Sequence, residues 1–187
     1  MKSFPFVAFP GTETQGQRET LPAEEVLRDY VDVPKFLEAC KKCPNYAHRW
    51  SCPPFDFNPK ELWKEYSSAE FFCVKLSPVG EAAKKAAGED AREYILPYMR
   101  VFEDNLRQRQ SMHPGALLLA PGACRTCRTC ARESGNPCRM PEACRHSPEA
   151  LGLDVSALTE KLFGWPIQWA KPNEAPEYFT LLGAILK

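Results

Sequence analysis

Residues 122–147 read GACRTCRTCARESGNPCRMPEACRHS, and this stretch organises the chain because it holds five of the nine cysteines. Its first four cysteines, Cys124, Cys127, Cys130 and Cys138, follow the order C-x2-C-x2-C-x7-C. Three thiols separated by two residues each are how iron–sulfur proteins bring thiolates to the corners of a cluster. Zinc also accepts four thiolates, but its usual signature is two separated pairs. The spacing therefore favours a [4Fe-4S] cluster, and zinc is the alternative.

Arginines are concentrated around these cysteines, although the whole chain has 24 basic and 24 acidic residues. The charged residues between Cys124 and His146 are Arg125, Arg128, Arg132, Arg139 and Arg145 against Glu133 and Glu142. A metal centre held by four thiolates carries negative charge, which nearby guanidinium groups would stabilise while lowering the thiol pKa values. The alternative is that the arginines form a solvated basic face. A disulfide framework is not favoured, because the number of cysteines is odd and no secretory signal is visible.

A second cysteine motif covers residues 40–54, CKKCPNYAHRWSCPP, and contains Cys40, Cys43 and Cys52 in the order C-x2-C-x8-C. The prolines that follow Cys43 and Cys52 remove N–H donors and fix the direction of the chain. His48 makes a zinc alternative possible, because C-x2-C-x4-H-x3-C is one residue short of the zinc-knuckle spacing. The motif predicts a second metal site with only three thiols.

The composition limits the class of protein. We expect residues 1–187 to form a single metal-binding domain, which at this length buries roughly 70% of its unfolded surface and does not need metal to have a core. Zero formal net charge argues against a nucleic-acid partner. No apolar stretch approaches the roughly 20 residues that cross a bilayer, and the amino terminus is not a signal peptide. We therefore expect a reducing cytoplasm and no membrane partner, while the oligomeric state is not indicated.

The apolar pattern predicts an α+β fold, with a small sheet of about four strands, a long helix and cysteine-rich metal-binding loops. Residues 1–20 are expected to form an irregular arm whose aromatic side chains dock. Cys73 is expected to be a small buried core residue. Two helices are predicted between residues 22 and 40, separated at Asp32 and Pro34. Further helices are predicted over 58–66 and, as the long helix, over 81–112. Short helices are predicted after Pro141, Pro148 and Asp154. The predicted strands are 69–76, 116–120 as a central strand leading into Cys124, 167–171 and 178–186.

The two cysteine motifs, CKKCPNYAHRWSCPPF from residue 40 and GACRTCRTCARESGNPCRMPEACRHSPEALGLDV from residue 122, together resemble a prokaryotic family of predicted metal-binding proteins of unknown function. The resemblance extends from about residue 40 to the carboxy terminus. It implies a domain with cysteine ligands. The pattern of this family is not expected to have a cysteine at position 144 or a histidine at position 48, so the resemblance does not make Cys144 or His48 a ligand. The metal ligands that it carries over are Cys40, Cys43, Cys52, Cys124, Cys127, Cys130 and Cys138.

Three functions are compatible with these motifs. The first is a redox protein whose one or two [4Fe-4S] clusters pass electrons to a partner protein. The second is an enzyme with an open cluster, since the first motif needs a fourth ligand from Cys73, Cys144, His48, or a water or substrate. The third is a zinc-stabilised binding module. No nucleotide-binding fingerprint is present and the three histidines are scattered, so no catalytic residue is assigned.

Overall fold

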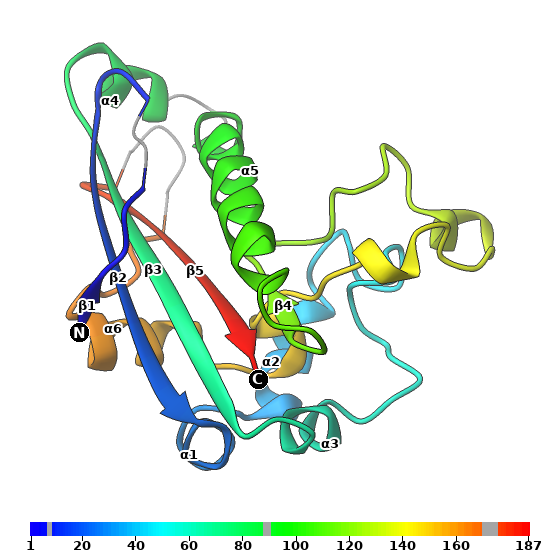
Figure 1. Ribbon diagram of the computed structural model, residues 1–187. Coiled ribbons are helices and arrows are strands. Elements are labelled where there is room, and N and C mark those ends of the chain that lie inside the picture. The colour runs from blue at the N-terminus through cyan, green and yellow to red at the C-terminus, as the bar shows by residue number, and fades with distance from the viewer. Residues whose placement is uncertain (7–8, 88–90, 170–175) are drawn as a thin grey trace.

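The computed structural model describes residues 1–6, 9–87, 91–169 and 176–187, with only the backbone of Arg92. Its centre is a five-stranded antiparallel sheet with the strand order β1-β2-β3-β5-β4 (Figure 1). The strands are β1 (Lys2–Ser3), β2 (Thr12–Pro22), β3 (Ser68–Pro78), β4 (Leu117–Leu119) and β5 (Phe179–Leu186). Together with a long helix, this sheet confirms the predicted α+β class.

Helices cover both faces of the sheet. The α-helices are α1 (Ala23–Asp29), α2 (Val33–Cys40), α3 (Pro59–Lys64), α4 (Glu81–Ala86), α5 (Ala91–Gln110) and α6 (Val155–Phe163). The 3₁₀ helices are η1 (Ala131–Ser134), η2 (Pro141–Ala143) and η3 (Glu149–Leu151). On one face Phe102 and Leu106 of α5 pack on the sheet, and on the other face Val26 of α1, Trp63 of α3 and Leu158 of α6 do so.

The central strand β3 supplies both cores because successive side chains point to opposite faces. Phe72 and Val74 face α5, whereas Phe71 and Cys73 join the opposite core. Cys73 is fully buried and its pKa is raised by burial, which confirms the prediction of a core residue. On β5, a side chain at Gly183 would place its Cβ 2.4 Å from a methyl group of Leu106, so this glycine allows α5 to pack directly on the sheet.

The amino-terminal prediction was wrong in its main part. Residues 1–20 are not an irregular arm, because β2 occupies Thr12–Pro22 and pairs along its whole length with β3. The strand has almost no apolar side chains, so it lacks the alternation that marks a half-buried strand. It is held by backbone pairing, and the buried hydroxyl of Thr12 contacts the Tyr94 and Tyr98 hydroxyls at 2.6 and 2.5 Å. The predicted docking of aromatic residues is confirmed for Phe4, which is buried.

Two predicted strands also need correction. Residues 116–120 do form a strand, β4, but it lies at the edge of the sheet and not in the centre. It is apolar because both of its faces are covered, Leu119 by one core and Leu118 by the other. The chain near His146 also covers its outer edge, where Ala120 N donates to His146 O at 3.1 Å. Of the predicted strand 167–171, residues 167–169 are not in a strand, and 170–171 lie outside the described residues. In place of strand pairing, a side-chain hydrogen bond holds the chain just before residue 167, because the Tyr178 hydroxyl donates to Pro166 O at 2.7 Å.

The predicted helix over 81–112 is divided into α4 and α5. Pro97 lies inside α5 without ending it, and Gly88 falls outside the described residues. Within the described ranges, no helix has the length and apolar character needed to cross a membrane.

Both cysteine motifs lie on the same side of the molecule, beyond the edge of the sheet that β4 forms (Figure 1). The first motif follows the carboxyl end of α2, and the second leaves β4 directly. The main cysteine segment is therefore attached to the end of a rigid strand, as the sequence predicted.

Candidate metal centre

Thiols from the second motif surround one pocket. It is a narrow cavity of about 20 Å³, and residues 49–51 of the first motif complete its wall. The cysteines that line it are Cys124, Cys127, Cys130, Cys138 and Cys144, all of them half-buried. The structure thus brings together the four predicted ligands of this motif and adds a fifth thiol.

Cys144 is the thiol that sequence reasoning missed. The short helix η2 brings it back toward Cys138, and its thiol hydrogen bonds to that of Cys124. This hydrogen bond lowers the pKa of Cys124 to about 4. Burial opposes the shift, and hydrogen bonds with Thr126 add to it. Cys144 itself has a raised pKa, because it is the partner that keeps the proton. The only signal in the sequence was a further cysteine six residues after Cys138.

Serine variants of Cys138 and Cys144 show which of these two thiols binds the metal and which only lies beside it. We expect Cys138→Ser to lose the metal of the second motif and Cys144→Ser to keep it, because only Cys138 belongs to the motif spacing. Metal content and the visible spectrum of the two variants, purified identically, are the measurements. Full metal retention by Cys138→Ser together with loss in Cys144→Ser would reverse the two roles.

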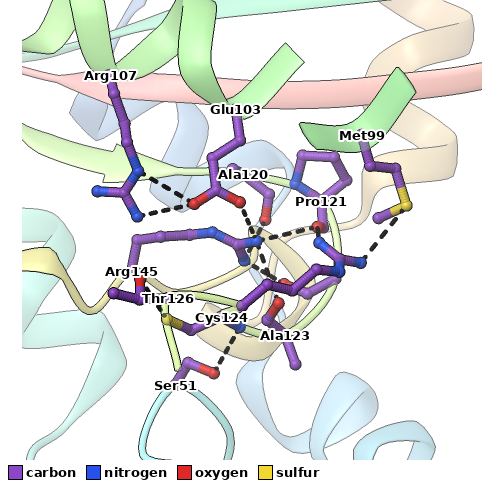
Figure 2. A network of polar contacts seen from close by, with 12 residues as sticks. Ser51, Met99, Glu103, Arg107, Ala120, Pro121, Ala123, Cys124, Thr126 and Arg145 are labelled. Carbon is purple, nitrogen blue, oxygen red and sulfur yellow. Dashed lines mark hydrogen bonds and ion pairs between the residues drawn. The ribbon is translucent and has the colours of Figure 1, made fainter. Parts of the chain in front are cut away.

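A buried ion pair holds the backbone that leads into Cys124 (Figure 2). Arg145 is 1% exposed and pairs with Glu103 of α5, which also binds Arg107. Its guanidinium donates to the carbonyl oxygens of Ala120 at 3.2 Å, Ala123 at 3.1 Å and Gly122. Burial alone would raise the pKa of Glu103, but its bonds to Arg145 and Arg107 hold that pKa below its usual range. The path of residues 120–124 is therefore fixed from the sheet side.

A second arginine joins the two cysteine motifs. Arg132 donates to the carbonyl oxygens of Arg49 at 3.0 Å, Cys52 at 2.7 Å and Pro54 at 2.7 Å. Its guanidinium carbon also lies 4.9 Å from the ring centre of Trp50. A solvated basic face is therefore the wrong interpretation for Arg132 and Arg145, whose main partners are backbone carbonyls.

Ser51 forms a further connection between the motifs. It is buried, and its hydroxyl accepts a hydrogen bond from Cys124 N at 3.0 Å (Figure 2). The same hydroxyl lies 3.7 Å from the sulfur of Cys52. Its carbonyl oxygen is 3.1 Å from Nδ1 of His146. One residue thus contacts a cysteine of each motif.

Two cysteines of the first motif, Cys40 and Cys43, lie in the same turn. Cys43 N donates to Cys40 O at 2.9 Å in the turn that follows α2. Burial, followed by the charges of Cys52 and Cys43, raises the pKa of Cys40 to about 11. His48 is exposed to solvent. Burial and these neighbours therefore favour the protonated form of the Cys40 thiol near neutral pH.

The donor sets consist of thiols, which both zinc and iron–sulfur clusters take as ligands. In the described part of the chain, no three Cys, His, Asp or Glu side chains converge as ligands of one metal ion. Tetrahedral zinc with bonds of about 2.3 Å needs sulfurs about 3.8 Å apart. A cluster instead takes thiolates at its separate corners.

Comparison with known proteins identifies one family. The family model described as "Predicted metal-binding protein (DUF2284)" matches residues 27–186, which include both cysteine motifs. No curated protein and no solved structure matches the chain.

Proposed function

Since this chain belongs to the DUF2284 family of predicted metal-binding proteins, we propose that it is an iron–sulfur redox protein with ligands from both cysteine motifs. The family confirms the resemblance found in the sequence and leaves the choice between iron and zinc open. In the proposal, one [4Fe-4S] cluster takes Cys124, Cys127, Cys130 and Cys138. A second takes Cys40, Cys43 and Cys52. A redox partner protein and a reducing cytoplasm belong to the same proposal.

The observation that carries the proposal is the pocket lined by thiols of the second motif. Its thiols come from a loop that is braced by Arg145 on one side and Arg132 on the other. This bracing lowers the ordering cost of cluster binding, because the backbone that the two arginines contact is already placed. Backbone N–H groups and guanidinium groups nearby favour the negative charge of a thiolate-bound cluster.

The connection between the motifs supports electron transfer. An iron–sulfur cluster supplies one-electron redox chemistry when it is bound. Ser51 contacts Cys124 and Cys52, and Arg132 binds the Cys52 carbonyl from the segment between Cys130 and Cys138. These contacts hold two thiol groups at a fixed separation, which is what a pair of electron carriers requires.

A reductive titration without oxygen tests this function. We expect the wild-type protein to take up about two electrons per chain, one for each cluster. The Cys52→Ser variant should take up about one, because it retains only the cluster of the second motif. Absorbance and electron paramagnetic resonance during the titration give the count. A protein that contains metal but accepts no electrons would contradict the redox function.

A groove beside the thiols favours a second candidate, an enzyme with an open cluster. It is lined by Cys43 and Cys124, by Arg49 and Arg125, which outnumber its one carboxylate, Glu93, and by apolar side chains that include Met99. Among the described residues, neither arginine forms an ion pair. A small organic anion could therefore bind next to a thiol of each motif. A cluster spectrum that shifts on adding such an anion would favour the enzyme.

A further inference from the structure

The groove beside the thiols has the size of a small-molecule site. Its volume is about 680 Å³, within the roughly 300–1,000 Å³ that is usual for ligand pockets. The first cysteine motif, residues 122–125 and the amino-terminal half of α5 meet around it, and Trp169 adds to its wall. The cavity between the thiols of the second motif holds only about 20 Å³. An organic molecule therefore has room in the groove and not between the thiols.

Arg125 brings a half-buried positive charge to this groove, and no carboxylate of the described residues forms an ion pair with it. Its guanidinium donates to Pro121 O at 3.3 Å and to the sulfur of Met99 at 3.5 Å (Figure 2). A thioether sulfur is a weak acceptor, whereas charged groups that leave water are as a rule paired. An anion in the groove would supply the partner that this guanidinium lacks.

The backbone makes room for this guanidinium. Gly122, which also lines the groove, has a φ of 71°. A Cβ added there would lie 2.8 Å from Nη2 of Arg125 and 3.1 Å from the terminal methyl carbon of Met99. The guanidinium is therefore seated in the wall of the groove, and a cation that is already positioned loses little conformational freedom when it binds an anion.

Arg49 adds a second cation from the first motif. Its Nε donates to Oδ1 of Asn45 at 2.8 Å, which fixes the side chain and leaves its two terminal nitrogens for a ligand. Guanidinium groups bind carboxylates through two parallel hydrogen bonds. The one carboxylate that lines the groove, that of Glu93, is exposed to solvent. The groove therefore has the charge that suits an anion.

The apolar part of the wall selects the body of the ligand. Ile95, Leu96 and Met99 line the groove, as does Trp169, whose side chain is 73% exposed. Aromatic rings pair favourably with one another, so an exposed indole ring in a pocket suits a flat ring. An inorganic anion would leave this apolar wall unused. The combination of two guanidinium groups and an aromatic wall fits an anion that carries a ring.

We propose that the groove binds a small aromatic carboxylate, with its carboxylate on Arg125 and Arg49 and its ring against Trp169. The ligand lies beside Cys43 and Cys124, one thiol of each motif. The proposed site deepens the second candidate function and rests on it for the role of the ligand as a substrate, whereas binding itself requires no metal.

Calorimetric titration of protein purified without oxygen tests this site with 3-phenylpropionate as the probe. We expect 3-phenylpropanamide, which has the ring without the charge, and acetate, which has the charge without the ring, to bind at least about tenfold more weakly. Arg125→Gln should weaken binding of 3-phenylpropionate by about tenfold or more, because it removes a charged hydrogen-bond donor. Arg128→Gln is the matched control, since Arg128 is exposed in the same loop and does not line the groove, and it should bind as the wild type does.

Tryptophan fluorescence locates the bound ring without relying on a variant that weakens binding. The probe should change the emission of the wild type, and Trp169→Phe should keep the heat of binding while losing the emission change, because Trp63 and Trp165 are buried elsewhere.

Several results would overturn the proposed site. These are no binding at millimolar 3-phenylpropionate, equal affinity in wild type and Arg125→Gln, or equal affinity for inorganic phosphate, which has no ring. The redox function is judged separately from the metal content. A protein that holds zinc, contains no iron and still binds the probe through Arg125 would refute the iron–sulfur function and support the aromatic carboxylate site.

Discussion

Replacing Cys127 by serine is expected to remove the brown colour of the cluster in the second motif and about four iron atoms per chain. Cys127 is the middle thiol of the C-x2-C-x2-C triple and lines the pocket. The spare thiol of Cys144 interacts with Cys124 and Cys138, so it is poorly placed to replace Cys127. Iron and sulfide analysis with the visible spectrum measures the effect.

Cys73→Ser is the matched control for this substitution, since it also exchanges a thiol for a hydroxyl. Cys73 is buried in the sheet core and is absent from the pocket lining. The control should keep the wild-type iron content. A Cys127→Ser protein with full iron and full absorbance would refute the assignment, and a large loss of iron from Cys73→Ser would make Cys73 a ligand.

The Glu103→Gln substitution is expected to lower the free energy of unfolding by about 3 kcal/mol, because it leaves the Arg145 guanidinium without its buried counter-charge. The loop that carries Cys124 should loosen as well, since Arg145 binds the carbonyls of residues 120–123. Urea unfolding of the metal-free protein gives the stability, and the rate of iron release gives the effect on the site.

Glu61→Gln is the control for Glu103→Gln, because Glu61 pairs with Lys64 at 2.8 Å on the exposed surface. Its loss should cost less than about 1 kcal/mol. The pKa of Glu103 is held below its ordinary value of 4.5, so the pair stabilises the fold above that pH. The difference between wild type and Glu103→Gln should therefore shrink as the pH falls below 4.5. Equal effects of both substitutions at neutral pH would contradict this account.

Local signals in the sequence predicted much of the fold. Asn58 and Asp154 were expected at helix starts, and each side chain accepts a hydrogen bond from a backbone N–H two or three residues later. A cap depends only on neighbouring residues, so its signature is present in the sequence. The strand β2 was missed because its stability comes from pairing with β3, which its own polar side chains do not indicate.

The site was predictable to the extent that spacing determines it. Four cysteines at short intervals were expected to share a centre, and they line one pocket. The position of Cys144 depends on the turn of η2. The arginines were expected to balance cluster charge, yet Arg145 finds its carboxylate partner 42 residues away on α5. Contacts of this kind follow from tertiary packing and leave no pattern in the sequence.

The most direct test of the central claim is the content of iron, zinc and acid-labile sulfide in protein purified without oxygen. The account predicts about eight iron and eight sulfide per chain, with a brown visible spectrum, for two clusters. About four iron and four sulfide per chain would indicate a single cluster. Zinc at about one or two per chain, with no sulfide and no colour, would contradict the iron–sulfur function and indicate a zinc-stabilised binding module.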